Sequence, residues 1–116
     1  MERDVKVKIC GITTETEIGY LNESEADYAG FVFWEKSKRY ITLQKAKKLK
    51  DKLINDIKAV AVMVSPEIEF VKEIENAGFD ILQIHGELKP EVLNKAVKPI
   101  SVSYTHLRAH ETRRHL

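Results

Sequence analysis

The sequence has little of several features that mark particular protein classes. Its single cysteine, Cys10, excludes an internal disulfide and any metal site built from several cysteines. No apolar run approaches the roughly 18 residues that a membrane span needs. The first residues, M-E-R-D-V-K, also lack the apolar segment of a secretory signal. We therefore expect a cytoplasmic protein that does not enter a membrane.

An excess of charge of one sign is also missing. The 19 Lys and Arg residues nearly balance the 18 Asp and Glu residues, which gives a formal net charge of +1. Nucleic-acid-binding domains usually carry a clear basic excess, so we expect no nucleic-acid partner. The 116 residues include 43% hydrophobic and 32% charged side chains. This composition is typical of one folded domain.

Short apolar runs alternate along the chain with amphipathic segments. Strands are expected at 5–10, 28–34, 57–64, 80–85 and 99–103, with a helix after each of the first four. The first helix should begin in a capping box made by Thr14 and Glu17. The apolar face of the second helix is Leu43, Ala46, Leu49, Leu53 and Ile54, and its wet face holds Lys45, Lys47, Lys48, Lys50 and Lys52.

The third helix has the clearest boundaries in the sequence. Ser65 is its expected N-cap, Pro66 its first residue, and Gly78 marks its end. A fourth helix should span 90–97. Strands separated by helices predict a parallel sheet, and hence an α/β fold of four βα units plus a fifth strand. An open dinucleotide-binding sheet is disfavoured, because the first strand is not followed by G-x-G-x-x-G.

Four segments carry a specific pattern when they are taken together and in order. They are V-K-I-C-G-I-T at 7–13, A-G-F-V-F at 29–33, S-K-R-Y at 37–40 and L-Q-I-H-G-E at 82–87. This set resembles the phosphoribosylanthranilate isomerase family, whose members are ribulose-phosphate-binding (β/α)8 barrels of tryptophan biosynthesis. The resemblance implies an aldose–ketose isomerase that performs an Amadori rearrangement on a small phosphosugar substrate. It implies no metal and no organic cofactor.

The chain is short for that fold, since a complete barrel needs at least about 200 residues. We therefore expect residues 1–103 to be the N-terminal half of a (β/α)8 TIM barrel. The resemblance places the family's general-acid aspartate on a later strand and its phosphate-binding loops near the seventh and eighth strands. Neither region has a counterpart here, and Glu111 does not match the family pattern. The fragment alone is accordingly expected to be inactive.

Cys10 is the candidate catalytic base. The rearrangement needs a base that removes a proton from the carbon beside an iminium. Alternation along the first strand places Lys8 and Cys10 on one face, with Val7 and Ile9 on the other face against the helices. Cys10 then points inward at the end of the strand where barrel enzymes hold catalytic groups. A cation such as Lys8 would favour the thiolate. The alternative is an inert buried cysteine.

Arg39 and His85 are the candidate substrate-binding residues. Arg39 follows the second strand on a loop, where a guanidinium can hold a carboxylate in a forked geometry, and the family's matching arginine lines the substrate site. An ordinary surface arginine is the alternative. His85 shares the inward face of the fourth strand with Gln83, and a structural histidine is the alternative. We interpret three aromatic residues as core: Phe31, Phe33 and Trp34.

Residues 104–116 differ from the rest of the chain. They hold three of the four histidines, and the spacing of His106 and His110 fits a metal pair. No third ligand is evident, so we expect no metal site. The segment 102–112 also resembles a translated sequencing-adapter read-through. We therefore expect 104–116 to be a non-family tail that is unfolded or an artefact.

Two other functions stay open. The first is a non-catalytic half-barrel assembly module that completes its barrel with a second chain or copy, because a half barrel leaves strand edges open to self-association. The second is a related barrel enzyme such as indole-glycerol-phosphate synthase, against which K-I-C-G at 8–11 argues.

Overall fold

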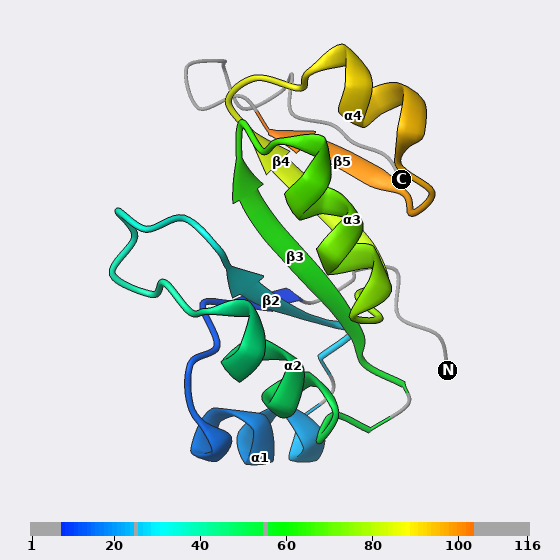
Figure 1. Ribbon diagram of the computed structural model, residues 1–116. Coiled ribbons are helices and arrows are strands. Elements are labelled where there is room, and N and C mark those ends of the chain that lie inside the picture. The colour runs from blue at the N-terminus through cyan, green and yellow to red at the C-terminus, as the bar shows by residue number, and fades with distance from the viewer. Residues whose placement is uncertain (1–7, 25, 55, 104–116) are drawn as a thin grey trace.

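The computed structural model describes residues 8–24, 26–54 and 56–103. Strands and helices alternate along the chain (Figure 1). The strands are β1 (Lys8–Cys10), β2 (Tyr28–Val32), β3 (Lys58–Val64), β4 (Ile81–His85) and β5 (Ile100–Ser103). The helices are α1 (Glu15–Glu23), α2 (Leu43–Lys50), α3 (Ile68–Asn76) and α4 (Pro90–Lys95). The predicted order of elements is confirmed.

The five strands form one sheet in the order β1-β2-β3-β4-β5, and every neighbouring pair is parallel. Each strand thus pairs with the next strand along the chain, and a helix makes each return connection. This is the topology of consecutive βα units in a barrel. The expected partial (β/α)8 barrel, with four βα units and a fifth strand, is confirmed.

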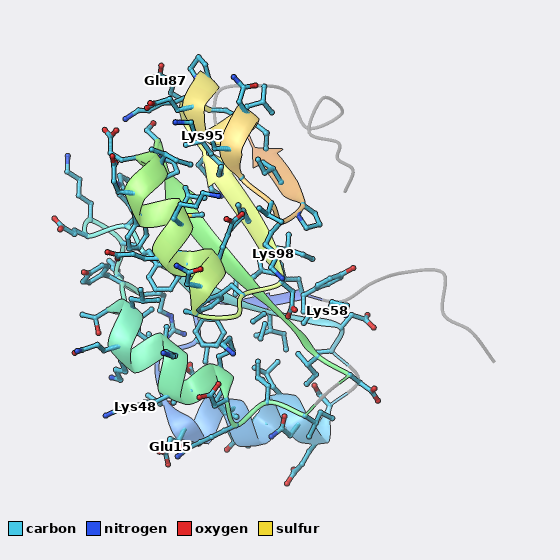
Figure 2. The ribbon with its side chains drawn as sticks, turned by 45° about the vertical axis from the view of Figure 1, so that its right-hand side comes forward. Glu15, Lys48, Lys58, Glu87, Lys95 and Lys98 are labelled. Carbon is cyan, nitrogen blue, oxygen red and sulfur yellow. The ribbon has the colours of Figure 1, made fainter. Side chains whose placement is uncertain are left out.

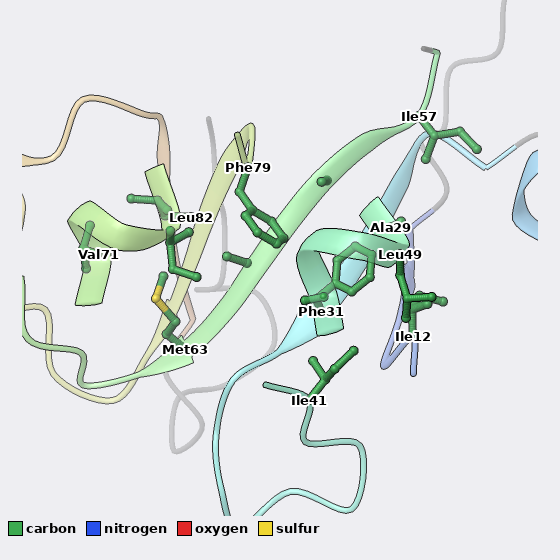
Figure 3. Packing of buried hydrophobic residues seen from close by; sticks show 14 of the residues in the cluster. Ile12, Ala29, Phe31, Ile41, Leu49, Ile57, Met63, Val71, Phe79 and Leu82 are labelled. Carbon is green, nitrogen blue, oxygen red and sulfur yellow. The ribbon is translucent and has the colours of Figure 1, made fainter. Parts of the chain in front are cut away.

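The helices cover only one face of the sheet. Figure 1 shows α3 running along β3 and β4. The main core lies between this face and the helices and includes Phe31, Met63, Leu82 and Val71 (Figure 3). A smaller apolar cluster of Val60, Val62 and Ile81, flanked by Tyr28 and Val32, contains strand residues only. We call the sheet face that carries this smaller cluster the open face.

Three aromatic rings join β2 to the region around α3. The ring of Phe79 meets Phe31 edge-on at 5.7 Å and Phe33 edge-on at 5.6 Å between centroids. Such edge-to-face pairs add about 0.5–1.5 kcal/mol each beyond the burial of their area. Phe31 is fully buried and Phe33 packs against the same core, so their interpretation as core residues is confirmed.

Charged side chains lie on the outside of the molecule, as Figure 2 shows for Glu15 on α1 and Lys48 on α2. The wet face predicted for the second helix is largely confirmed, with one modification. Lys50 is partly buried, and its ammonium lies 5.9 Å from the centre of the Phe79 ring. Its stem therefore covers part of the aromatic core.

The capping box predicted for the first helix is present. The backbone N–H of Glu17 donates to Thr14 Oγ1 at 3.2 Å, and the N–H of Thr14 donates to Glu17 Oε1 at 3.1 Å. The second helix is shorter than predicted. It ends at Lys50, so Leu53 and Ile54 lie beyond it, and Ile54 is 45% exposed.

Ser65 is not the N-cap of α3, which corrects the prediction. The helix begins at Ile68 with Glu67 as its N-cap, so Pro66 also precedes it. Ser65 has a φ of +44°, whereas an N-cap residue has extended backbone angles. Its hydroxyl accepts a hydrogen bond from the Glu87 N–H at 2.8 Å. The end of the helix was predicted correctly, because Gly78 directly follows the C-cap Ala77.

Candidate active site

The three predicted site residues lie at the same end of the sheet. Cys10 is the last residue of β1, His85 is the last residue of β4, and Arg39 belongs to the connection after β2. Since all strands are parallel, their carboxyl ends share one edge. Active sites of βα barrels are built at this edge.

Cys10 is exposed on the open face, so it is not the buried cysteine that the alternative interpretation expected. Its register partner on β2 is Gly30. A Cβ atom at position 30 would lie only 2.9 Å from Cys10 Sγ, so the thiol occupies the space that a side chain there would need. Ile9 points to the other face but is 41% exposed, contrary to expectation. In the described part of the chain, β1 is an edge strand paired only with β2.

Arg39 reaches the end of β1 by lying over Gly11. Gly11 has a φ of +88°, a conformation that favours glycine, and its N–H donates to the Gly30 carbonyl at 2.9 Å. A Cβ at position 11 would be 3.0 Å from Arg39 Cγ. The guanidinium Nη1 lies 3.4 Å from Glu17 Oε2, and the Arg39 side chain is 56% exposed. A guanidinium has five N–H donors, so Arg39 has further donors on its exposed side besides the contact with Glu17.

One carboxylate links the first helix to this arginine. Glu17 Oε1 accepts from the Thr13 N–H at 2.7 Å and from the Thr14 N–H, while Oε2 faces Arg39. The Thr13 hydrogen bond is the main reason that the pKa of Glu17 is lowered; burial opposes it, and Thr14 and Arg39 assist it. The group that caps α1 therefore also orients Arg39.

The connection that carries Arg39 is tied to the sheet at both ends. The Phe33 N–H donates to the Val62 carbonyl at 2.9 Å, and the Ile41 N–H donates to the Val32 carbonyl at 3.0 Å. Inside the loop, the Arg39 N–H donates to Ser37 Oγ at 3.1 Å. These bonds hold the loop in place beside the ends of β1 and β2.

A hollow of about 480 Å³ opens at this edge. Its lining consists of Val32, Trp34, Ser37, Val62, Val64, His85 and Gly86. The interpretation of Trp34 as core is wrong, because the strand ends at Val32 and the indole is 43% exposed. An exposed aromatic wall beside apolar side chains suits a flat, apolar ligand group. The sequence analysis gave Trp34 no site role because it extended the strand to residue 34, two residues beyond its end in the structure.

His85 contributes the main polar group of the hollow. Its Nε2 lies 3.2 Å from Nε2 of Gln83, whose Oε1 accepts a hydrogen bond from the ammonium of Lys8. Burial, and secondly the charge of Lys8, lower the pKa of His85, so the imidazole is neutral at neutral pH. The sequence analysis placed Gln83 on this face but gave it no role. It expected Lys8 to act on the thiol of Cys10 and not to contact Gln83.

The expectations of no metal site and no membrane span can be compared with the structure only over the described residues. Within 8–24, 26–54 and 56–103, no three His, Cys, Asp or Glu side chains are grouped as metal ligands would be. Over these same residues no helix is long and apolar enough to cross a bilayer. His106, His110 and the rest of 104–116 lie outside the described residues.

Replacing Gly30 by alanine should destabilise the protein and displace the Cys10 thiol. The new methyl group would overlap Sγ at 2.9 Å, and overpacking of this kind costs about 1–3 kcal/mol. Gly19→Ala is the matched control, because Gly19 lies in α1 with nothing within 4 Å of its Cβ position. That change should stabilise by about 0.5–1 kcal/mol. Urea unfolding followed by circular dichroism measures both, and equal effects of the two variants would contradict the described packing.

Glu17→Ala should destabilise the protein at neutral pH by about 1 kcal/mol, the usual value of a helix cap. The folded state holds the pKa of Glu17 below its unfolded value. Its contribution is therefore complete above the ordinary glutamate pKa of about 4.3 and is lost as the pH falls through the lower folded value. Urea unfolding at pH 7 and in strong acid should show the difference between variant and parent shrinking. A difference that stays constant with pH would contradict this role for the carboxylate.

Comparison with known proteins agrees with this geometry. The family model described as N-(5'phosphoribosyl)anthranilate (PRA) isomerase matches residues 7–113. That match reaches into the segment 104–116 that the sequence analysis set apart. The N-(5'-phosphoribosyl)anthranilate isomerase of Clostridium acetobutylicum is 46% identical over 92 residues, which cover 78% of this chain and 44% of the relative. A Streptococcus pneumoniae relative of the same name is 41% identical over 88 residues, 75% of this chain and 44% of its own length.

Solved structures give the same result. The isomerase of Thermotoga maritima superposes with a TM-score of 0.76 at 37% identity, over 86% of this chain and 49% of that protein. The Thermus thermophilus isomerase gives a TM-score of 0.72 at 30% identity, over 84% of this chain and 50% of that protein. The chain thus spans about half the length of the proteins it matches. On this combined evidence, the chain belongs to the phosphoribosylanthranilate isomerase family.

Proposed function

We propose that this chain supplies the N-terminal half of an active site for the Amadori rearrangement of phosphoribosylanthranilate in tryptophan biosynthesis. The observation that carries the proposal is that Cys10, Arg39, Trp34 and His85 all lie at or just after the carboxyl ends of strands in one parallel sheet. Trp34 and His85 also line the hollow at this edge. Sequence relatives named for this activity support it. One similar solved structure, with 37% identity, is described as a complex with reduced 1-(o-carboxyphenylamino)-1-deoxyribulose 5-phosphate.

Cys10 is the proposed general base. Once the ribose ring has opened to an iminium, the thiolate takes the proton from the neighbouring carbon. The electron pair of that C–H bond forms the carbon–carbon double bond of the enolamine. The enolamine becomes the amino ketone when a proton returns to the former iminium carbon and the enol hydroxyl releases its proton to the surroundings. The exposed position of the thiol on the open face supports this role, because a substrate carbon could reach the sulfur there.

Arg39 and the hollow are the proposed binding groups for the anthranilate part. A forked guanidinium suits the carboxylate, and Arg39 lies beside Gly11 with most of its side chain exposed. The Trp34 indole and the valines of the hollow offer an apolar surface for the flat ring. His85 adds one polar contact from the same wall.

The proposed half site lacks some of the groups that the reaction needs. Protonation of the ring oxygen needs a general acid, and the family resemblance places this acid and the phosphate loops on later strands. We therefore propose that the chain does not turn over substrate alone. The cytoplasm remains the proposed location, which fits an enzyme that acts on a phosphorylated metabolite.

Reconstitution in trans tests this function. The chain is mixed with the C-terminal half of the Clostridium acetobutylicum relative, and the loss of phosphoribosylanthranilate fluorescence is followed. We expect no turnover from the chain alone, turnover in the mixture, and its loss with Cys10→Ala. Lys48→Ala is the control, because Lys48 is exposed on α2 away from the site. Turnover by the unmixed chain that Cys10→Ala abolishes would contradict the proposed inactivity, and an inactive mixture of folded halves would contradict the function.

Ligand binding can be followed through Trp34, the only tryptophan of the chain. Anthranilate absorbs where tryptophan emits, so the reduced ligand of the similar structure should quench Trp34 emission when it binds. Arg39→Ala should weaken binding by about tenfold or more, since a hydrogen bond to a charged group contributes about 1.5–3 kcal/mol. Lys38→Ala, in the same loop and also exposed, is the matched control. Equal affinities of the two variants would contradict the proposed role of Arg39.

A second candidate function is the half-barrel assembly module. It is favoured by the sheet order, because β1 and β5 each have one strand neighbour in the described part of the chain. Unpaired edges are templates for pairing with another chain or copy. Sedimentation analysis distinguishes this candidate, and a strictly monomeric, soluble species at high concentration would contradict it.

A further inference from the structure

Three polar side chains form a continuous hydrogen-bonded chain across the open face. Lys8 on β1 donates through its ammonium to Oε1 of Gln83 on β4, although β2 and β3 lie between these strands. The amide nitrogen of Gln83 then lies 3.2 Å from Nε2 of His85. This series of hydrogen bonds therefore runs from the edge strand β1 to the wall of the hollow.

The donors and acceptors in this series determine which group donates each hydrogen bond. A lysine ammonium has three donors and no acceptor, so the amide oxygen of Gln83 must face Lys8. The NH2 group, which can only donate, then faces His85. Nε2 of His85 must accept that bond and so carries no proton. A neutral imidazole with a bare Nε2 carries its proton on Nδ1.

The surroundings of His85 favour this neutral form. On β3, the register partners of Gln83 and His85 are Val62 and Val64. Neither valine carries a charge. On the other side, β5 places Ser101 beside Gln83. Burial and the charge of Lys8 both act against protonation of the imidazole, and the pKa of His85 is lowered as a result. Lys8 is the charged group acting on that pKa in the described part of the chain.

We propose that Gln83, held by Lys8, is a positioning residue that fixes His85 as the neutral Nδ1–H tautomer. Because Nε2 is occupied, any hydrogen bond from His85 to a ligand in the hollow is donated from Nδ1. The site is thereby selective for a ligand oxygen that accepts a hydrogen bond next to the apolar wall. Such an oxygen can belong to a hydroxyl, carboxylate or phosphate group. This ligand preference rests on the proposed function, whereas the tautomer does not.

Nuclear magnetic resonance of the full chain with labelled histidine tests the tautomer directly. Long-range proton–nitrogen correlations distinguish a protonated ring nitrogen from a bare one, and His85→Asn identifies the signals of His85. At a pH slightly above neutral we expect a protonated Nδ1 and a bare Nε2. Free histidine side chains favour the opposite tautomer, so a His85 signal with protonated Nε2, or a cation, would overturn the proposal.

Variants of the chain separate positioning from packing. Gln83→Glu replaces the donor by a carboxylate, so His85 should protonate Nε2 and its pKa should rise. Lys8→Met frees the amide to rotate, and a mixture of tautomers should appear. Ser101→Ala, which changes the neighbour on the other side of Gln83, should leave the tautomer unchanged. An unchanged tautomer in Gln83→Glu would overturn the role of Gln83, and the unmodified chain decides the tautomer even if a variant fails to fold.

Binding of the reduced deoxyribulose phosphate ligand, read from Trp34 emission, tests the consequence for the site. An asparagine amide nitrogen takes roughly the place of Nδ1, and a glutamine amide nitrogen roughly that of Nε2. Both variants should bind more weakly than the parent, and His85→Gln about fivefold more weakly than His85→Asn, the effect of one neutral hydrogen bond. The reverse order would overturn donation from Nδ1. Absence of binding by the parent would instead contradict the proposed function and leave the measured tautomer standing.

Discussion

The parallel pairing of each strand with its successor is the constraint on which the rest of the structure depends. Such pairing forces the chain to return across one face of the sheet, and a helix makes this return in each unit. All carboxyl ends then meet at one edge. Cys10 and His85 are far apart in the sequence, yet both end strands at that edge. The other face is left free for Lys8 and Gln83 to meet.

Close packing at the end of β1 couples the stability of the first βα unit to the site. Gly11 and Gly30 leave room for the Arg39 stem and the Cys10 thiol, respectively. Glu17 caps α1 and also holds the Arg39 guanidinium. A change in any of these residues therefore alters both the folding free energy and the position of a candidate site group. The candidate base Cys10 and Arg39 are thereby both linked to the start of the same helix.

The sequence predicted what local patterns determine. Apolar periodicity placed all five strands and four helices, and the Thr14–Glu17 capping box formed because its partners are three residues apart. Contacts from distant residues explain the errors. The hydroxyl of Ser65 binds the backbone of Glu87, 22 residues away, and Trp34 lines a hollow together with residues of β3 and β4. Gln83 was placed correctly by alternation, but its role depends on Lys8, which no local pattern reveals.

The protonation states in this half of the site determine which part of the reaction it can perform. Glu17 is held in its charged form by the hydrogen bonds that lower its pKa, so it has no proton to donate. Arg39 does not release its proton in proteins. His85, whose pKa is also lowered, is neutral, and a neutral imidazole N–H is a very weak acid. Glu17, Arg39 and His85 can therefore accept or donate hydrogen bonds, but none of the three can serve as a general acid for the ring oxygen. In the proposed reaction, proton removal at carbon follows ring opening, so the proposed base Cys10 depends on an acid supplied from elsewhere. This dependence is the chemical reason to expect turnover only when a second half completes the barrel.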